Sequence, residues 1–132
     1  MENRITPSYI TELKENEVFV FGSNKAGRHG KGAAKLALSF GAHYGQAEGQ
    51  QGNTYAIPTV DFSVTRTLGV MEIKIYVDRF IVYAKQTPDK HFLVTEIGCG
   101  LAGLSPKDIA PLFSDAGDLL NVWLPHRFRR LI

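Results

Sequence analysis

The stretch EVFVFGSNKAGRHGKGAAKLAL, residues 17–38, decides how this chain is expected to fold. Its first six residues are rich in valine and phenylalanine, and such a short apolar run predicts a strand buried on both faces. Four glycines follow, from Gly22 to Gly32. Beyond them, residues 32–42 are predicted to form a helix, because apolar residues recur there at helical spacing. These apolar residues are Ala33, Leu36, Ala37 and Phe40.

The rest of the chain continues to alternate between strand and helix patterns. Residues 43–53, which are polar and rich in glycine and glutamine, are expected to form a loop. Strands are predicted at 54–59, 91–98 and 121–125, and helices at 68–85 and from Ser105, with a kink or restart at Pro111. This order predicts an α/β fold: a three-layer α/β/α arrangement around a mainly parallel central sheet. The length of 132 residues favours a single domain, 1–132.

Composition and charge restrict the classes of function. A net charge of +2 does not indicate a nucleic-acid partner. The single cysteine, Cys99, cannot form an intrachain disulfide, and with the four scattered histidines it makes no zinc pattern, so no metal and no cofactor are expected. The first residues show no signal-peptide pattern, and no apolar run reaches the length of a membrane span. A cytoplasmic protein with no membrane partner is therefore expected.

A second glycine loop, residues 98–103, follows the predicted strand at 91–98. Like the first glycine loop, it comes directly after a strand and directly before a helix. Ligands of open α/β sheets collect at the carboxyl ends of the strands, and glycine backbone can approach phosphate oxygens closely. We therefore expect the two loops to face one crevice and to hold a diphosphate between them. The alternative is that the glycines only form tight turns and bind nothing.

Two common phosphate-binding motifs do not fit these loops. A P-loop needs a second glycine followed by lysine and then serine or threonine, but Gly27 is followed by arginine and histidine. The Rossmann fingerprint begins at Gly30 and Gly32 but fails because Lys35 occupies its last position. The sequence therefore disfavours a kinase, a GTPase or a dinucleotide-dependent dehydrogenase.

Both glycine loops resemble those of the macrodomain superfamily. The segment FVFGSNKAGRHGKGAAKLAL is similar to the first ligand loop of that superfamily, and FLVTEIGCGLAGLSPKDIAPLF is similar to its second. Between them lies GNTYAIPT, where a macrodomain has another strand, so the resemblance covers roughly residues 18–113. It implies a macrodomain-like fold and an ADP-ribose-type nucleotide as ligand, either free or attached to an ADP-ribosylated macromolecule.

The resemblance also implies which residues bind this ligand. The second glycine loop would hold the diphosphate and the distal ribose, and the first would close over them from the other side. Asn24 matches the asparagine that contacts the distal ribose in hydrolytic macrodomains, so the resemblance makes it the candidate catalytic residue. The implied ligand-binding residues are Gly22, Ser23, Asn24, His29, Gly30, Gly32, Ala33, Gly98, Cys99, Gly100, Leu101, Ala102 and Gly103.

The sequence IGCGL is most similar to the macrodomain branch that releases ADP-ribose from modified carboxylates. That branch uses a lysine and an aspartate, whose places are taken here by Val60 and Ala102, and the neighbouring candidates are Asp61 and Glu96. Three functions therefore stay open. They are hydrolysis of ADP-ribosyl linkages or ADP-ribose derivatives, nucleotide binding without catalysis (a reader or sponge), and an interaction domain whose glycines are architectural.

Overall fold

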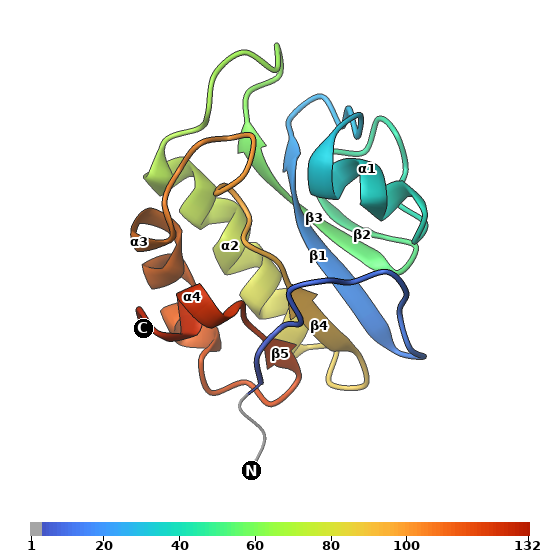
Figure 1. The fold of residues 1–132 in the computed structure, drawn as a ribbon, viewed down its shortest axis with the longest axis vertical. Coiled ribbons are helices and arrows are strands. Elements are labelled where there is room, and N and C mark those ends of the chain that lie inside the picture. Colours follow the sequence, from blue (N-terminus) through green and yellow to red (C-terminus); the bar gives the residue numbers. More distant parts are fainter. Residues whose placement is uncertain (1–3) are drawn as a thin grey trace.

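A computed structural model describes residues 4–132 and has an α/β fold (Figure 1). The strands are β1 (Glu17–Asn24), β2 (Gly49–Gln51), β3 (Thr54–Val60), β4 (His91–Val94) and β5 (Val122–Trp123). They form one mixed sheet in the order β2-β3-β1-β4-β5. The helices are α1 (Gly32–Leu38), α2 (Val70–Lys85), α3 (Pro106–Ile109), the 3₁₀ helix η1 (Ala110–Ala116) and α4 (His126–Arg129).

β1 is the central strand, and its side chains are buried on both faces of the sheet. β1 pairs in parallel with β3 on one side and with β4 on the other. Val18 and Val20 belong to the core that contains α2, whereas Phe19 and Phe21 belong to the core that contains α1. None of these four side chains is more than 2% exposed. Each contributes roughly 1.5–3 kcal/mol through burial, so these four side chains hold β1 firmly in the sheet.

The two cores differ in size and in the helices that cover them (Figure 1). The larger contains the apolar stripe of α2, whose helical spacing in the sequence predicted the helix at 68–85. This stripe comprises Ile73, Val77, Phe80, Ile81 and Ala84. Phe80 packs edge-on against Phe92 and Phe113. The smaller core contains Ala34 and Ala37 of α1, Ala56 of β3 and the two phenylalanines of β1. Helices therefore pack against β1 from both sides.

α1 is shorter than the predicted helix 32–42, and the predicted apolar stripe is wrong in part. α1 buries Ala34 and Ala37, whereas Ala33 and Leu36 are exposed. The helix ends at Leu38, so Phe40 reaches the smaller core from the turn beyond it. A stripe that continues to Phe40 needs an unbroken helix, and this one stops too early for that.

The predicted loop at 43–53 contains β2, which the sequence analysis missed. β2 pairs antiparallel to β3, with Gln50 opposite Tyr55 and Gln51 opposite Thr54. Gly52 and Asn53 connect the two strands, and Gly52 has the positive φ of 59° that a two-residue hairpin turn requires. Glycine and glutamine are poor strand formers, so pairing with β3 determines this strand and its composition does not.

The carboxyl-terminal part agrees with the prediction of a restart at Pro111. α3 ends at Ile109, and η1 continues the chain as a 3₁₀ helix that contains the proline. The carboxylate of Asp108 accepts a hydrogen bond from the backbone N–H of Ser105 at 3.0 Å, which caps the start of α3. The predicted strand 91–98 is limited to β4, because the chain leaves the sheet at residue 95 to begin the second glycine loop.

Gly27 offers a test of how tightly the first glycine loop packs. Its φ is 69°, and an added Cβ would lie 2.4 Å from the carbonyl carbon of Gly45. We expect Gly27→Ala to lower the free energy of unfolding by about 2 kcal/mol or more, because it combines backbone strain with a steric clash. Gly30→Ala is the matched control, because an added Cβ there meets no atom within 4 Å. Urea denaturation of both variants measures the difference, and equal stabilities would contradict the packing described.

Candidate functional site

A cavity of about 610 Å³ lies where β1, β3 and β4 end. Three loops contribute to its walls: the part of the first glycine loop that follows β1 (residues 25–32), the 61–69 loop after β3, and the segment 95–105 after β4, which contains the second glycine loop (residues 98–103). The 61–69 loop is the green segment at the top of Figure 1. Because the three strands are parallel, their carboxyl ends bring these loops to one edge of the sheet. The two glycine loops therefore share one cavity, as the sequence analysis expected.

Most of the residues implied by the macrodomain resemblance line this first cavity. Three do not: His29, Cys99 and Gly103. Those that do are Gly22, Ser23, Asn24, Gly30, Gly32, Ala33, Gly98, Gly100, Leu101 and Ala102.

The cavity is open where the loops are bare of side chains. At Gly30 and at Gly100, an added Cβ would meet no protein atom within 4 Å, and neither residue has a positive φ. At Gly32 the φ is 59°, and an added Cβ would lie 3.5 Å from Cδ1 of Leu101. The side chain of Leu101 thus reaches from the second glycine loop to the first, so the loops meet at this point without filling the cavity.

Several backbone N–H groups of the two loops donate to no protein acceptor in the described part of the chain. Such groups bind water or a ligand instead, and glycine-rich loops present them readily to phosphate oxygens. All of these residues line the first cavity. They are Gly30, Lys31, Gly32, Ala33, Gly100, Leu101 and Ala102.

The charged side chains in the lining also suit an anion. Arg28 and Lys31 line the cavity, and both residues are exposed. Glu96 is the one acidic residue among the lining residues, and Arg127 neutralises it. The guanidinium donates from Nε at 2.7 Å and from Nη2 at 2.6 Å to the two carboxylate oxygens. This hydrogen bonding lowers the pKa of Glu96, which disfavours its carboxylate as a general base.

Asn24 lies in the cavity wall, but its side chain is engaged in shaping the first glycine loop. Its Nδ2 donates to the carbonyl of Arg28 at 2.9 Å, and its Oδ1 accepts from the backbone N–H of the same residue at 2.9 Å. The Asn24 amide therefore closes the turn from 24 to 28 as a second peptide group would. One N–H and one lone pair of the amide are left over for a ligand.

His29 is not a ligand-binding residue in this structure, because its ring is fully buried. Nε2 lies 3.1 Å from the carbonyl of Gln46 and 3.2 Å from Oε1 of Gln51. Since both partners are acceptors, Nε2 carries the proton. The ring also packs edge-on against Phe21, with 5.2 Å between ring centroids. His29 thus anchors the first glycine loop to β1 and β2, and it neither contacts the cavity nor lies exposed as a loop histidine.

Cys99 and Gly103 also lie outside the cavity lining. Cys99 packs against the larger core, and its Sγ lies 3.5 Å from the carbonyl of Ile97. The N–H of Gly103 donates to the carbonyl of Gly100 at 3.0 Å, and its φ of 82° suits only glycine, so it closes the second glycine loop. Both residues therefore support the second glycine loop without lining the cavity.

A second cavity, of about 550 Å³, adjoins the first. The two cavities share Ala33, Thr95 and Glu96 in their walls. The other walls of the second cavity are largely apolar and come from segments far apart in the sequence. They comprise Thr6, Pro7, Ser8, Ile10, Phe19, Leu36, Pro125, His126 and Arg127.

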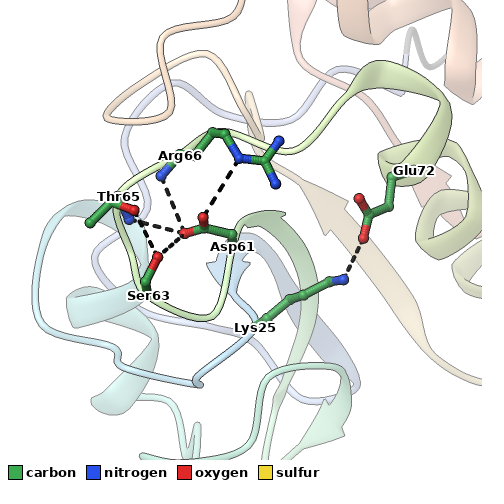
Figure 2. Close-up of polar contacts among 6 residues, drawn as sticks. All are labelled: Lys25, Asp61, Ser63, Thr65, Arg66 and Glu72. Atoms are coloured by element: carbon green, nitrogen blue, oxygen red, sulfur yellow. Dashed lines mark hydrogen bonds and ion pairs between the residues drawn. The ribbon is translucent and has the colours of Figure 1, made fainter.

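Contacts between the loops hold the first cavity in shape. The hydroxyl of Thr67 donates to the carbonyl of Ala102 at 2.5 Å, which connects the 61–69 loop to the second glycine loop. Lys25, at the start of the first glycine loop, forms an ion pair with Glu72 in the first turn of α2 (Figure 2). The site is therefore preorganised, which reduces the entropy that a ligand would have to remove on binding.

Sequence reasoning missed several residues of these cavities. In the first cavity they include Thr59, Val64 and Thr95, and in the second cavity it missed the whole segment 6–10. Thr59 and Thr95 lie at the carboxyl ends of β3 and β4, so the strand-end rule could have found them. Segment 6–10 carries no motif that indicates a cavity wall.

Two further searches of residues 4–132 gave negative results. No three His, Cys, Asp or Glu side chains of these residues are grouped in a way that could hold a metal ion. None of the helices in this range has the length and apolar character needed to cross a membrane.

The reactivity of the Cys99 thiol tests whether this side chain is buried as the structure describes. Burial, reinforced by the charge of Glu96, raises the pKa of Cys99 from 9.0 to about 11. The thiolate fraction at pH 8 is then roughly a hundredfold lower than in the unfolded chain, so we expect iodoacetamide to react that much more slowly with the native protein. Mass spectrometry of the alkylated fraction over time, with and without urea, measures the ratio. Equal rates would contradict this environment and make Cys99 a candidate nucleophile.

Comparisons with known proteins do not identify a relative. Searches of protein-family models, of curated proteins and of solved structures each found no match to this chain. Its function must therefore be inferred from the geometry of the two cavities.

Proposed function

We propose that this protein binds an ADP-ribose-type nucleotide, with the diphosphate held between the two glycine loops of the first cavity. The observation that carries the proposal is the set of backbone N–H groups without a protein acceptor, which come from both loops and line one cavity. Arg28 and Lys31 add positive charge there. A mononucleotide phosphate would need only one such loop, whereas two facing loops suit two linked phosphates.

The second cavity suits the base of the same nucleotide. Ile10, Leu36 and Pro125 give it apolar walls, against which the faces of a heterocycle can pack. The shared residues Ala33 and Thr95 would then lie beside the sugar that joins the base to the diphosphate. Each cavity falls within the usual range of about 300–1,000 Å³ for ligand sites, and an extended dinucleotide-like molecule would use both.

The finer fold assignment is part of this proposal. We assign the chain to a macrodomain-like, three-layer α/β/α architecture with a mainly parallel sheet. Support comes from the helices that pack on β1 from opposite sides and from the parallel pairing of β1 with both neighbours. The antiparallel β2 then corresponds to an added edge strand.

Of the two nucleotide functions, binding without catalysis has more support than hydrolysis. The candidate bases are engaged elsewhere: Glu96 is paired with Arg127, and Asp61 accepts hydrogen bonds within its own loop. Burial raises the pKa of Cys99 to about 11, which lowers its reactivity as a nucleophile. We therefore propose a reader or sponge, and its ligand is either the free nucleotide or the same group attached to a macromolecule.

Gly100→Val tests the nucleotide site. The new side chain would project into the first cavity without backbone strain, so we expect calorimetry to detect no ADP-ribose binding while the melting temperature stays within about 3 °C of the parent. Gly69→Val is the matched control, because Gly69 also has open space around it and lines neither cavity. Unchanged affinity in Gly100→Val would contradict the site, and an absence of binding by the parent chain would contradict the function.

Asn24→Ala separates the reader from the hydrolase. Removal of the hydrogen bonds to Arg28 loosens the first glycine loop, so we expect ADP-ribose affinity to fall by about tenfold. We also expect neither protein to release ADP-ribose from a carboxylate-modified protein over several hours. Release by the parent chain that disappears in Asn24→Ala would instead support hydrolysis and a catalytic Asn24.

A further inference from the structure

Val64 has an unusual backbone conformation at the wall of the first cavity. Its φ is 61°, in the left-handed region that a β-branched residue rarely adopts. Its side chain lines the cavity, and the residue is 41% exposed. Strained residues of this kind persist only where their surroundings hold them, and they often lie where a ligand is contacted.

Asp61 holds the residues on both sides of Val64 (Figure 2). Its Oδ1 accepts hydrogen bonds from the backbone N–H groups of Thr65 at 3.0 Å and Arg66 at 3.2 Å, and from the hydroxyl of Ser63 at 3.1 Å. The backbone closes the same loop, because the N–H of Val64 donates to the carbonyl of Asp61 at 3.1 Å. The side chain of Asp61 therefore holds the residues of the 61–69 loop together through these hydrogen bonds.

The base of this loop is also anchored. Val60 and Thr67 form an antiparallel bridge, and the N–H of Leu68 donates to the carbonyl of Thr59 at 2.8 Å. The hydroxyl of Thr67 connects the loop to the second glycine loop through Ala102. Because these contacts close the base of the loop and Asp61 holds its middle, Val64 cannot easily leave its left-handed conformation.

The position of Val64 suggests which part of a ligand it would meet. Thr59, Val60 and Val64 line the first cavity and not the second. The residues that the cavities share, among them Ala33 and Thr95, come from other elements. With the base in the second cavity and the diphosphate between the glycine loops, the group beyond the diphosphate lies toward Val60 and Val64.

We infer that Val64 is a specificity-determining residue that packs against the terminal sugar of an ADP-ribose-type ligand, and that Asp61 positions it. This inference rests on the proposed function. The isopropyl group offers an apolar surface to the carbon face of a ribose, and the constrained loop keeps that surface in place before the ligand arrives. A ligand without the terminal sugar makes no use of this contact.

The test compares Val64→Gly and Val64→Ala with the parent chain, using calorimetry with ADP-ribose and with ADP. ADP has the same base, ribose and diphosphate but no terminal sugar. Both variants should bind ADP-ribose about tenfold more weakly, the factor that corresponds to one buried valine side chain, and should bind ADP as the parent does. Only Val64→Gly removes the backbone strain of the positive φ, so the melting temperature of this variant should be higher than that of Val64→Ala.

Asp61 variants test the positioning role. Asp61→Ala removes the acceptor of three hydrogen bonds and should reduce the preference for ADP-ribose over ADP, whereas Asp61→Asn keeps an acceptor oxygen and should restore it. A parent chain that binds neither nucleotide would overturn the proposed function. A parent that binds both, with a preference unchanged in the Val64 variants, would overturn this inference alone. An equal loss for both nucleotides would also overturn it, because Val64 would then not act on the terminal sugar.

Discussion

The parallel pairing of β1 with both of its neighbours is the constraint on which the site depends. Phe19 lies opposite Thr54 of β3 and opposite Leu93 of β4. A slip of one residue would move Phe19 and Phe21 out of the smaller core, so burial on both faces fixes this register. The register determines where the three strands end, and hence the positions of the loops that follow them. The separation of the two glycine loops is thus set by apolar packing at a distance from the cavity.

The parts of the fold that could be predicted are those with a strong local pattern. The apolar run of β1 and the stripe of α2 identified both elements, because burial of their side chains outweighs other local preferences. Pro111 marked the change from α3 to η1 for an equally local reason, since proline has no N–H to donate. The shared cavity followed from topology: two loops that leave parallel neighbouring strands must emerge at the same edge.

The parts that could not be predicted depend on contacts between distant segments. The buried ring of His29 contacts Gln46 and Gln51, which lie about twenty residues further along the chain, in and just before β2. No residue of the glycine loop itself indicates that this histidine is buried. The strained Val64 likewise depends on Asp61, whose hydrogen bonds are visible only in three dimensions. Both glycine loops border the cavity, as their positions after parallel strands indicated. No local pattern indicated that side chains such as Asn24 would hold these loops in place.

The second cavity brings together segments from opposite ends of the described chain. Residues 6–10 and 125–127 share its wall, and the pairing of Ile5 with Leu124 holds these segments side by side. During synthesis, both glycine loops leave the ribosome before residues 125–127 do. A nascent chain can therefore complete both glycine loops while the second cavity still lacks part of its wall. The two cavities exist side by side only after β5 and the residues that follow it have docked.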